Sequence, residues 1–147
     1  MKYDKLKIEN QLCFPLYVCS KEIVKKYKPF LDELDLTYTQ YITMMILWDE
    51  KQLTVKQLGK KLFLDSGTMT PLLKKLESKG YVKRNRDIND ERNVIITITE
   101  KGIKLRNSAI TIPEKVGKCI NLSVEEAQLL YKILYSLINN LEDDENE

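Results

Sequence analysis

The sequence predicts a mainly α-helical chain with one small β-hairpin, an α+β fold. Glycine and proline, which weaken or interrupt helices, are scarce, with five and four copies in 147 residues. Apolar residues recur at helical spacing along most of the chain. One segment, residues 81–99, instead holds two β-rich runs, YVKRN and NVIITIT, on either side of a charged turn. That pattern is typical of a hairpin.

Two long helices are expected first. Residues 8–34 repeat apolar side chains at roughly helical spacing, and Pro15 and Pro29 should each kink this helix or mark its first turn. Residues 39–49 form the second helix, with Thr39 as its N-cap. The apolar stripe of the second helix comprises Ile42, Met45 and Ile46.

Two short helices with a tight connection follow. Thr54 can cap the first, either Asp65 or Ser66 can cap the second, and Gly80 terminates the second. The second helix is basic on its polar side. Together with the hairpin, whose tip RDINDER is charged, this order predicts a winged helix-turn-helix. The residues expected to face its core are Val55, Leu58, Leu62, Met69, Leu72, Leu73 and Leu76.

The rest of the chain is expected to form two further helices. The first opens at Thr99 and runs to about Lys118 with Pro113 inside it. The second begins with a capping box at Ser123 and is apolar along one side. The acidic residues 143–147 should fray. The sequence contains neither an internal repeat nor a long linker, so we expect a single domain spanning the whole chain.

Composition narrows the chemistry. No apolar run approaches the roughly 18–20 residues needed to cross a bilayer, and the N-terminus MKYDKLKIENQL lacks the apolar core of a secretory signal. We therefore expect a soluble protein of the reducing cytoplasm. Histidine is absent, which removes the Ser-His-Asp triad and nearly every common zinc site. We expect no metal, no cofactor and no enzymatic turnover. Three cysteines without a CxxC pair argue against a structural disulfide framework.

Charge is distributed unevenly. Residues 51–106 hold fourteen Lys and Arg against six Asp and Glu, whereas the flanking residues hold ten against sixteen. A basic middle between acidic ends suggests that the helix-turn-helix and the hairpin face a polyanion. For any single lysine the alternative is an ordinary solvated surface.

The candidate DNA-binding residues lie on the second short helix and in the hairpin. Hydroxyls near a helix N-terminus and lysines on its polar face suit phosphates and base edges, and wing arginines suit phosphates or the minor groove. Asp90 is expected to orient Arg92, because an unpaired carboxylate would repel DNA. The full set is Ser66, Thr68, Thr70, Lys74, Lys75, Arg84, Arg86, Asp90 and Arg92.

These segments resemble a known family. The stretch LDSGTMTPLLKKLESKGYVKRNRDINDERNVIITITEKG is similar to the winged-helix core of MarR-type transcriptional regulators, including its DxxDER wing. The N-terminal motifs ENQLCF, YKPxLDxL and LTYxQY resemble the OhrR branch, the organic-hydroperoxide sensors. Related thiol-based regulators of virulence and oxidative stress share the QLCF cysteine, so they remain an alternative branch.

The resemblance implies a homodimer on a pseudo-palindromic operator of double-stranded DNA. Helices about 6–36 and 99–142 would form the dimerisation region, and residues of about 38–98 the winged helix-turn-helix. The second short helix would enter the major groove and Arg92 the minor groove. The implied function is a repressor of organic-peroxide resistance genes that is released when an organic hydroperoxide oxidises Cys13.

Cys13 is the candidate redox residue. At about 100° per helical residue, Tyr17 and Tyr27 each lie about 40° from it, so the three share a face. Tyr27 is nevertheless about 21 Å farther along the helix, and it could meet only the Cys13 of a partner whose first helix runs antiparallel. The resemblance implies that Tyr27 and Tyr38 hydrogen-bond the reactive sulfur across the dimer, stabilising its thiolate, with Tyr17 nearby.

The first oxidation product would be a sulfenic acid. In the family it is then trapped by a low-molecular-weight thiol, by a protein cysteine or as a sulfenamide. Cys119 is a candidate resolving cysteine, with an inert helical cysteine as the alternative. Cys19 is expected to pack. For Cys13 itself the alternative is a small buried hydrophobe.

Two rival functions stay open at this point. A MarR-type repressor could instead be released by a small phenolic or aromatic ligand, bound between the dimerisation helices and the DNA-binding region. A thiol peroxidase would need repeated turnover with a reductant, and the sequence offers no recycling site for it.

Overall fold

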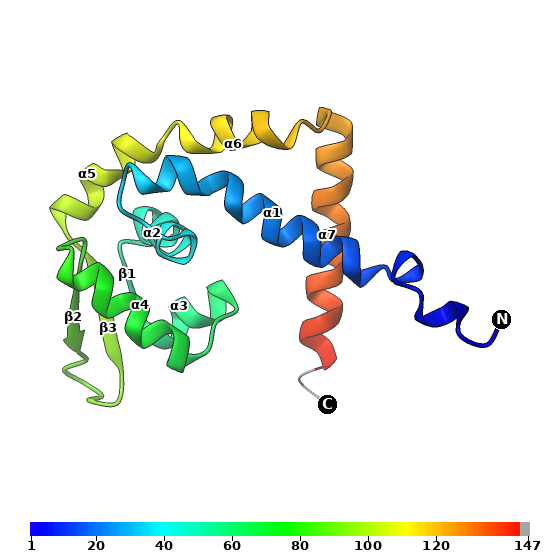
Figure 1. Ribbon diagram of the computed structural model, residues 1–147. Helices are drawn as coiled ribbons and strands as arrows, with labels where there is room; N and C mark the ends of the chain where they lie inside the picture. The colour runs from blue at the N-terminus through cyan, green and yellow to red at the C-terminus, as the bar shows by residue number, and fades with distance from the viewer. Residues whose placement is uncertain (145–147) are drawn as a thin grey trace. The chain divides into compact units, whose positions relative to one another are not determined.

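The protein is described here by a computed structural model that covers residues 1–144 and is mostly helical (Figure 1). Two 3-10 turns, η1 Asp4–Leu6 and η2 Ile8–Asn10, precede helix α1 Cys13–Asp32. The prediction of one helix over residues 8–34 is therefore wrong at its start. Pro15 lies in the first turn of α1, where a missing N–H leaves no hydrogen bond unmade.

Helix α2, Tyr38–Glu50, follows a short turn, and its N-cap is Thr37 rather than the predicted Thr39. The Thr37 hydroxyl accepts the Gln40 N–H at 3.3 Å, and the Thr37 N–H donates to the Gln40 side chain at 3.1 Å. This reciprocal pair is a capping box. Thr39 is the second residue of α2.

The buried face of α2 also differs from the prediction. Met45 is exposed, and Ile42 and Ile46 are only partly covered. Apolar residues occur on more than one side of this helix, so its sequence alone does not single out the face that packs. The residues that are buried are Gln40, Tyr41, Thr43, Met44 and Leu47.

The winged helix-turn-helix is present. It consists of β1 Gln52–Thr54, α3 Val55–Leu62, α4 Ser66–Ser78, β2 Val82–Arg86 and β3 Val94–Ile98. Thr54 caps α3 through a capping box with Gln57, as predicted for Thr54. Asp65 caps α4 by accepting the Thr68 N–H at 2.7 Å, which settles the choice between Asp65 and Ser66. Gly80 has a φ of +80°, as a glycine that terminates a helix requires.

The three strands form one antiparallel sheet in the order β1-β3-β2. Leu53 of β1 and Arg84 of β2 both pair with Ile96 of β3. Strand β1 was not predicted, because three residues between two helices are too few to show an alternating pattern. The predicted hairpin strands are confirmed.

The predicted apolar face of α4 is buried, and so is Leu58 of α3. Val55 and Leu62, which the sequence also assigned to the core, are only partly covered. The four buried residues of α4 are Met69, Leu72, Leu73 and Leu76.

The C-terminal part contains α5 Glu100–Ala109, α6 Ile112–Ile120 and α7 Val124–Asp144. The single helix expected from Thr99 to about residue 118 is two helices, because Pro113 cannot donate to the Ala109 carbonyl and instead lies in the first turn of α6. The capping box at Ser123 is confirmed, with bonds of 2.9 and 3.1 Å to Glu126. Part of the acidic end that was expected to fray, residues 145–147, lies outside the described residues.

The chain divides into two compact units, Met1–Ile112 and Pro113–Glu147, and the winged helix-turn-helix belongs to the first. Over residues 1–144, no helix is long and apolar enough to cross a membrane. Within the same range, His, Cys, Asp and Glu do not gather in a group that could hold a metal ion.

Candidate functional site

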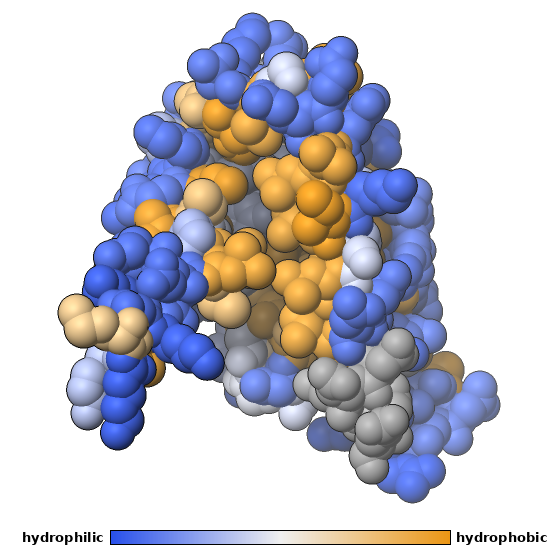
Figure 2. Space-filling view, turned by 90° about the vertical axis from the view of Figure 1, so that its right-hand side faces the viewer, coloured by the Kyte–Doolittle hydropathy of each residue, from blue (hydrophilic) through white to orange (hydrophobic). Residues whose placement is uncertain are grey.

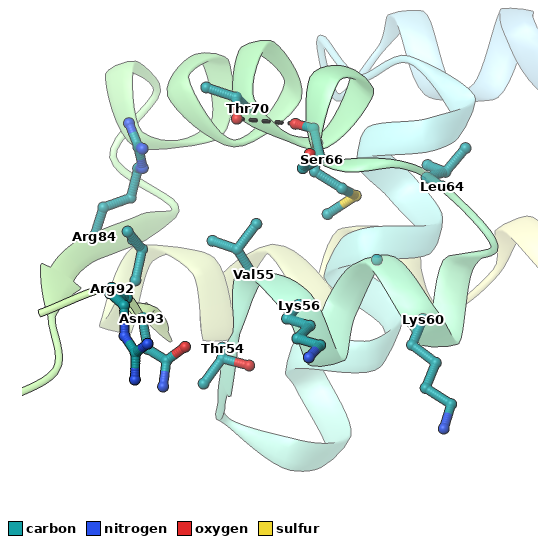
Figure 3. A pocket seen from close by; sticks show the side chains of 13 residues that line it. Thr54, Val55, Lys56, Lys60, Leu64, Ser66, Thr70, Arg84, Arg92 and Asn93 are labelled. Atoms are coloured by element: carbon teal, nitrogen blue, oxygen red, sulfur yellow. Dashed lines mark hydrogen bonds between the residues drawn. The ribbon is translucent and has the colours of Figure 1, made fainter. Parts of the chain in front are cut away.

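A cavity of about 450 Å³ opens between α3, the N-terminal turns of α4 and the hairpin (Figure 3). Lys56 and Lys60 project from α3, and Ser66 and Thr70 belong to α4. Arg84 and Arg92 contribute from the hairpin, and none of the described residues that line the cavity is acidic. A cavity with this lining suits an anion, such as a phosphate.

The α4 side chains differ in availability. Ser66 and Thr68 are exposed in the first turn, where the helix end favours negative charge. The Thr70 hydroxyl already donates to the Ser66 carbonyl at 2.9 Å, so its hydrogen is in use. Lys74 and Lys75 are exposed on α4 but do not line the cavity.

Arg84 is half-buried in strand β2. Its backbone N–H donates to the Glu77 carboxylate at 3.1 Å. Its Nε is buried and has no hydrogen-bond partner among the described residues. A buried donor left unpaired costs free energy.

The wing contains the predicted ion pair. Arg92 donates to both carboxylate oxygens of Asp90, at 3.0 Å from Nε and 3.2 Å from Nη2. These side-chain hydrogen bonds first, and the Arg92 backbone N–H second, lower the pKa of Asp90. Arg86 instead donates to the Glu91 carbonyl at 2.9 Å, so it turns back along the wing.

At the other end of the same unit, three tyrosines form a ring cluster. The ring centroids of Tyr27 and Tyr38 lie 4.9 Å apart. Tyr41 lies 5.8 Å from Tyr27 and 6.5 Å from Tyr38. Burial raises the pKa of all three phenols, and the electrostatic influence of Tyr38 adds to the increase at Tyr27. All three therefore keep their O–H donors at neutral pH.

Cys13 is the first residue of α1 and is exposed in the single chain. Leu12 occupies the N-cap position without a side-chain hydrogen bond. The N–H groups of a helix's first turn have no acceptor within the helix, so the thiol lies beside unpaired donors. The alternative of Cys13 as a buried hydrophobe is wrong for the single chain. Cys19, which was expected to pack, is exposed as well.

The structure separates the members of the predicted redox set. Cys13 and Tyr27 stand fourteen residues apart on one continuous helix, a rise of about 21 Å. Tyr17 is exposed, and its ring lies 5.5 Å from the Lys21 ammonium. Cys119 is an exposed free thiol near the end of α6.

Sequence reasoning missed three residues of these sites. Tyr41 belongs to the ring cluster, and Lys56 and Lys60 line the cavity. The spacing of each of these residues along the sequence could have identified it. Tyr41 follows Tyr38 by three positions, and the two lysines are four positions apart, so each pair shares one side of its helix.

Large apolar side chains reach the surface of both units (Figure 2). On α1 they surround the thiol end of the helix. On α7 they recur on successive turns. The exposed members on α1 are Phe14, Leu16, Tyr17 and Val24, next to Leu12 just before it. Those on α7 are Val124, Leu129, Leu130, Tyr131, Ile133, Tyr135, Leu137 and Leu141.

Comparison with known proteins identifies relatives of the whole chain. Residues 25–108 match the family described as transcriptional regulator SarA/Rot. The chain is 46% identical over 140 residues to the organic hydroperoxide resistance transcriptional regulator of Bacillus subtilis, covering 95% of both chains. It is 49% identical over 132 residues to the HTH-type transcriptional regulator SarZ of Staphylococcus saprophyticus, covering 90% of both.

Solved structures of AbfR, a Staphylococcus epidermidis protein, are also similar. Reduced AbfR bound to DNA matches with a TM-score of 0.77 and 34% identity, over 96% of this chain and 99% of that one. The disulfide form of AbfR matches with a TM-score of 0.64 and 35% identity, over 94% and 97% of the two chains.

Proposed function

The chain belongs to the MarR-type transcriptional regulators of the SarA/Rot family, in the OhrR-like branch, and we propose that it is a repressor released from DNA when Cys13 is oxidised. One observation carries the proposal. The exposed thiol begins helix α1, whereas the half-buried phenols of Tyr27, near the end of that helix, and Tyr38, at the start of α2, lie against each other. The known relatives supply the rest, because their names and structures describe hydroperoxide resistance, reduced and disulfide forms, and DNA binding.

DNA binding is assigned to the basic cavity and to the exposed side of α4. Ser66, Thr68, Lys74 and Lys75 would approach the major groove, and Arg92 would approach the minor groove. Asp90 would hold Arg92 in place through the two hydrogen bonds. Arg84, which lines the cavity, would add positive charge for a phosphate there. Arg86 would act through the wing's shape, since its guanidinium is already engaged.

The protein would act as a homodimer on a pseudo-palindromic operator. The apolar residues exposed on α1 and α7 support a partner subunit, because a water-soluble chain rarely leaves so many uncovered. If the α1 helices of two subunits run antiparallel, the phenols of Tyr27 and Tyr38 reach the partner's thiol. Tyr17, one turn beyond Cys13, would lie beside the same sulfur.

The redox step is an oxygen transfer from an organic hydroperoxide. The Cys13 thiolate attacks the terminal peroxide oxygen, the O–O bond breaks and an S–O bond forms to give the sulfenic acid, and the departing alkoxide takes a proton from water to leave as the alcohol. The resulting sulfenic acid then condenses with a thiol, releasing water and forming a disulfide. That thiol is either a low-molecular-weight thiol or Cys119. The bulkier sulfur would break the tyrosine contacts and change the spacing of the two α4 helices, which must match about one DNA turn.

The test is release from an operator duplex that the reduced protein has selected from a random pool. Fluorescence anisotropy would follow binding while cumene hydroperoxide is added, and intact mass would identify the adduct. Wild type should leave the duplex after one oxidation per subunit, and Cys13→Ser should stay bound. Cys19→Ser is the matched control and should be released like wild type. Release of Cys13→Ser by the hydroperoxide would end the proposal.

A second candidate function is release by a small phenolic or aromatic ligand. A hollow of about 260 Å³ between α1 and α2 favours it. Leu31, Leu36 and Tyr38 give this hollow an apolar lining. Lys25 lines it too, and so does Lys28, which is paired with Asp32 at 2.9 Å. Salicylate added to Cys13→Ser separates the two candidates: release at millimolar salicylate supports the ligand, and continued binding supports the redox switch.

The regulated genes are the remaining part of the proposal. The relatives include both a hydroperoxide-resistance regulator and SarZ regulators. We favour peroxide resistance because the relative that is named for it covers 95% of this chain. Transcript profiling of a deletion strain distinguishes one derepressed peroxidase gene from a broad set of stress or virulence genes.

A further inference from the structure

We propose that Tyr41 is a positioning residue that holds the phenols of Tyr27 and Tyr38 in the orientation that serves the thiol. The inference rests on the proposed function, since it concerns the same sulfur. Tyr41 touches neither Cys13 nor the hydroperoxide in this scheme. It acts through the two rings that lie against it.

The geometry places Tyr41 beneath both phenols. Its side chain is buried, with 3% of the residue exposed. Its ring is tilted by 45° against Tyr27 and by 47° against Tyr38, at centroid distances of 5.8 and 6.5 Å. Tilted pairs at these separations are favourable beyond simple burial. Tyr27 belongs to α1 and Tyr38 to α2, so Tyr41 fixes the mutual position of two rings from different helices.

The Tyr41 ring also contacts Trp48, which is hydrogen-bonded to α5. The Trp48 ring meets it edge-on at 6.3 Å and 70°. The Trp48 indole N–H donates to the Gly102 carbonyl of α5 at 2.9 Å. A Cβ added at Gly102 would come within 2.3 Å of the Tyr81 carbonyl oxygen, so the backbone of α5 packs closely against Tyr81 at this point. Trp48 therefore links the ring cluster to the backbone of α5.

The chemistry of the cluster agrees with this role. Tyr27 and Tyr38 can donate to a sulfur anion only while their phenols are protonated and correctly aimed. Burial, followed by the electrostatic influence of Tyr27 and Tyr38, raises the pKa of Tyr41. The Tyr41 phenol therefore lies close enough to those of Tyr27 and Tyr38 for their charge state to influence its own. Moving the shared ring would alter the aim of both donors at once.

The competing explanation is that Tyr41 is an ordinary core residue. Under that explanation its loss lowers stability but leaves the chemistry of Cys13 unchanged below the melting temperature. The two explanations therefore predict different rate constants for the oxidation of Cys13, which is measured on folded protein. Both predict that the variant is less stable.

The experiment compares Tyr41→Leu with Tyr41→Phe in the full-length reduced protein. Intact mass follows the loss of the Cys13 thiol after addition of cumene hydroperoxide. Tyr41→Leu should be oxidised about tenfold more slowly, the order expected when a charge-assisted hydrogen bond is weakened. Tyr41→Phe keeps the ring and should stay within about twofold of wild type. Operator affinity of the reduced variants should be unchanged.

Leu47→Ala is the matched control, because Leu47 is fully buried in the same helix and outside the ring cluster. It should lower the melting temperature and leave the oxidation rate at the wild-type value. If Tyr41→Leu does not fold, Trp48→Leu tests the same support, and a slower oxidation is again expected. A wild-type rate in the folded Tyr41→Leu or Trp48→Leu variant overturns the inference.

The outcomes also separate this inference from the proposed function. If wild-type protein responds to the hydroperoxide and Tyr41→Leu responds at the same rate, only the role of Tyr41 fails. If wild-type protein keeps its operator while Cys13 is oxidised, the redox switch itself fails.

Discussion

The two ends of helix α1 are in opposite states. At its C-terminal end Leu31 is 2% exposed, and Tyr27 rests against Tyr38 and Tyr41. At its N-terminal end Cys13 is exposed, and the preceding Leu12 is 85% exposed. Both ends belong to the same twenty-residue helix and the same compact unit.

Within a single chain, the phenol part of the proposed sensor is packed, whereas the thiol part is exposed. The phenol donors are already packed and oriented by α2, whereas the thiol end presents apolar surface to water. Burying that surface against another subunit would be favourable by roughly 25 cal/mol per Å². In the proposed homodimer, the phenol end of α1 in one subunit would cover the thiol end of α1 in the other.

The largest loss of stability is expected at the C-terminal end of α1, where the side chains are packed. Leu31→Ala should lower the free energy of unfolding by about 2–5 kcal/mol, because it leaves a cavity in a fully packed region. Urea denaturation at fixed protein concentration measures this loss. Leu16→Ala is the control at the thiol end of the same helix, where the residue is 41% exposed, and should cost less than about 1 kcal/mol. Equal costs would mean that the two ends are packed alike.

The thiol end should show its effect in assembly. Leu12→Asp should weaken dimerisation about a hundredfold, since a carboxylate would have to be buried without a partner. Sedimentation equilibrium measures the dissociation constant. Ile88→Asp, at a wing residue that is 98% exposed, is the matched control and should leave the dimer intact. An unchanged dimer in Leu12→Asp would remove this end from the subunit interface.

Removing one phenol should make the thiol less reactive. Tyr38→Phe keeps the ring and loses the donor, so Cys13 oxidation should slow by about tenfold. Tyr81→Phe is the control, because Tyr81 lies outside the ring cluster, with the Lys101 ammonium 5.0 Å from its ring. The rate is followed by intact mass. A rate equal to wild type in Tyr38→Phe would separate the phenol cluster from the thiol.

Capping of α2 should produce a smaller change. Thr37→Ala removes the N-cap and should cost about 1 kcal/mol of stability. Thr39→Ala should cost less, because Thr39 lies inside the helix and its hydroxyl forms a 3.3 Å hydrogen bond with the hydroxyl of Thr37 rather than capping a backbone N–H. Thermal unfolding of the two variants compares them directly. A larger loss from Thr39→Ala would contradict the observed cap.

The smallest effect is expected from pH. Burial raises the pKa of Tyr27, Tyr38 and Tyr41 above the unfolded value of about 10. A raised pKa stabilises the fold below the unfolded value, and that stability is lost as the pH rises through the folded values. The midpoint of thermal unfolding should therefore decrease as the pH is raised beyond about 10. The decrease should be less steep in Tyr38→Phe, which has lost one of these phenols. Phenolate absorbance, followed in the same samples, should show that some of the tyrosines ionise at a higher pH than the rest.

Much of the winged helix could be predicted because its signals are local. Thr54 and Asp65 cap their helices with hydrogen bonds to residues three positions away. Gly80 adopts a backbone conformation that other residues avoid. The Asp90–Arg92 pair spans two residues. Each of these features depends on neighbours in the chain, so residue type and spacing were enough to find them.

By itself the sequence determined the order of the helices up to residue 99, the hairpin and the basic middle of the chain, and it singled out Cys13 as the candidate redox residue. Tertiary structure alone decided which face of α2 is buried, that β1 joins the sheet, and that Tyr41 lies beneath Tyr27 and Tyr38. The physical reason is range. Caps and turns are governed by energies within a few residues, whereas burial and ring packing depend on surfaces brought together from distant parts of the chain.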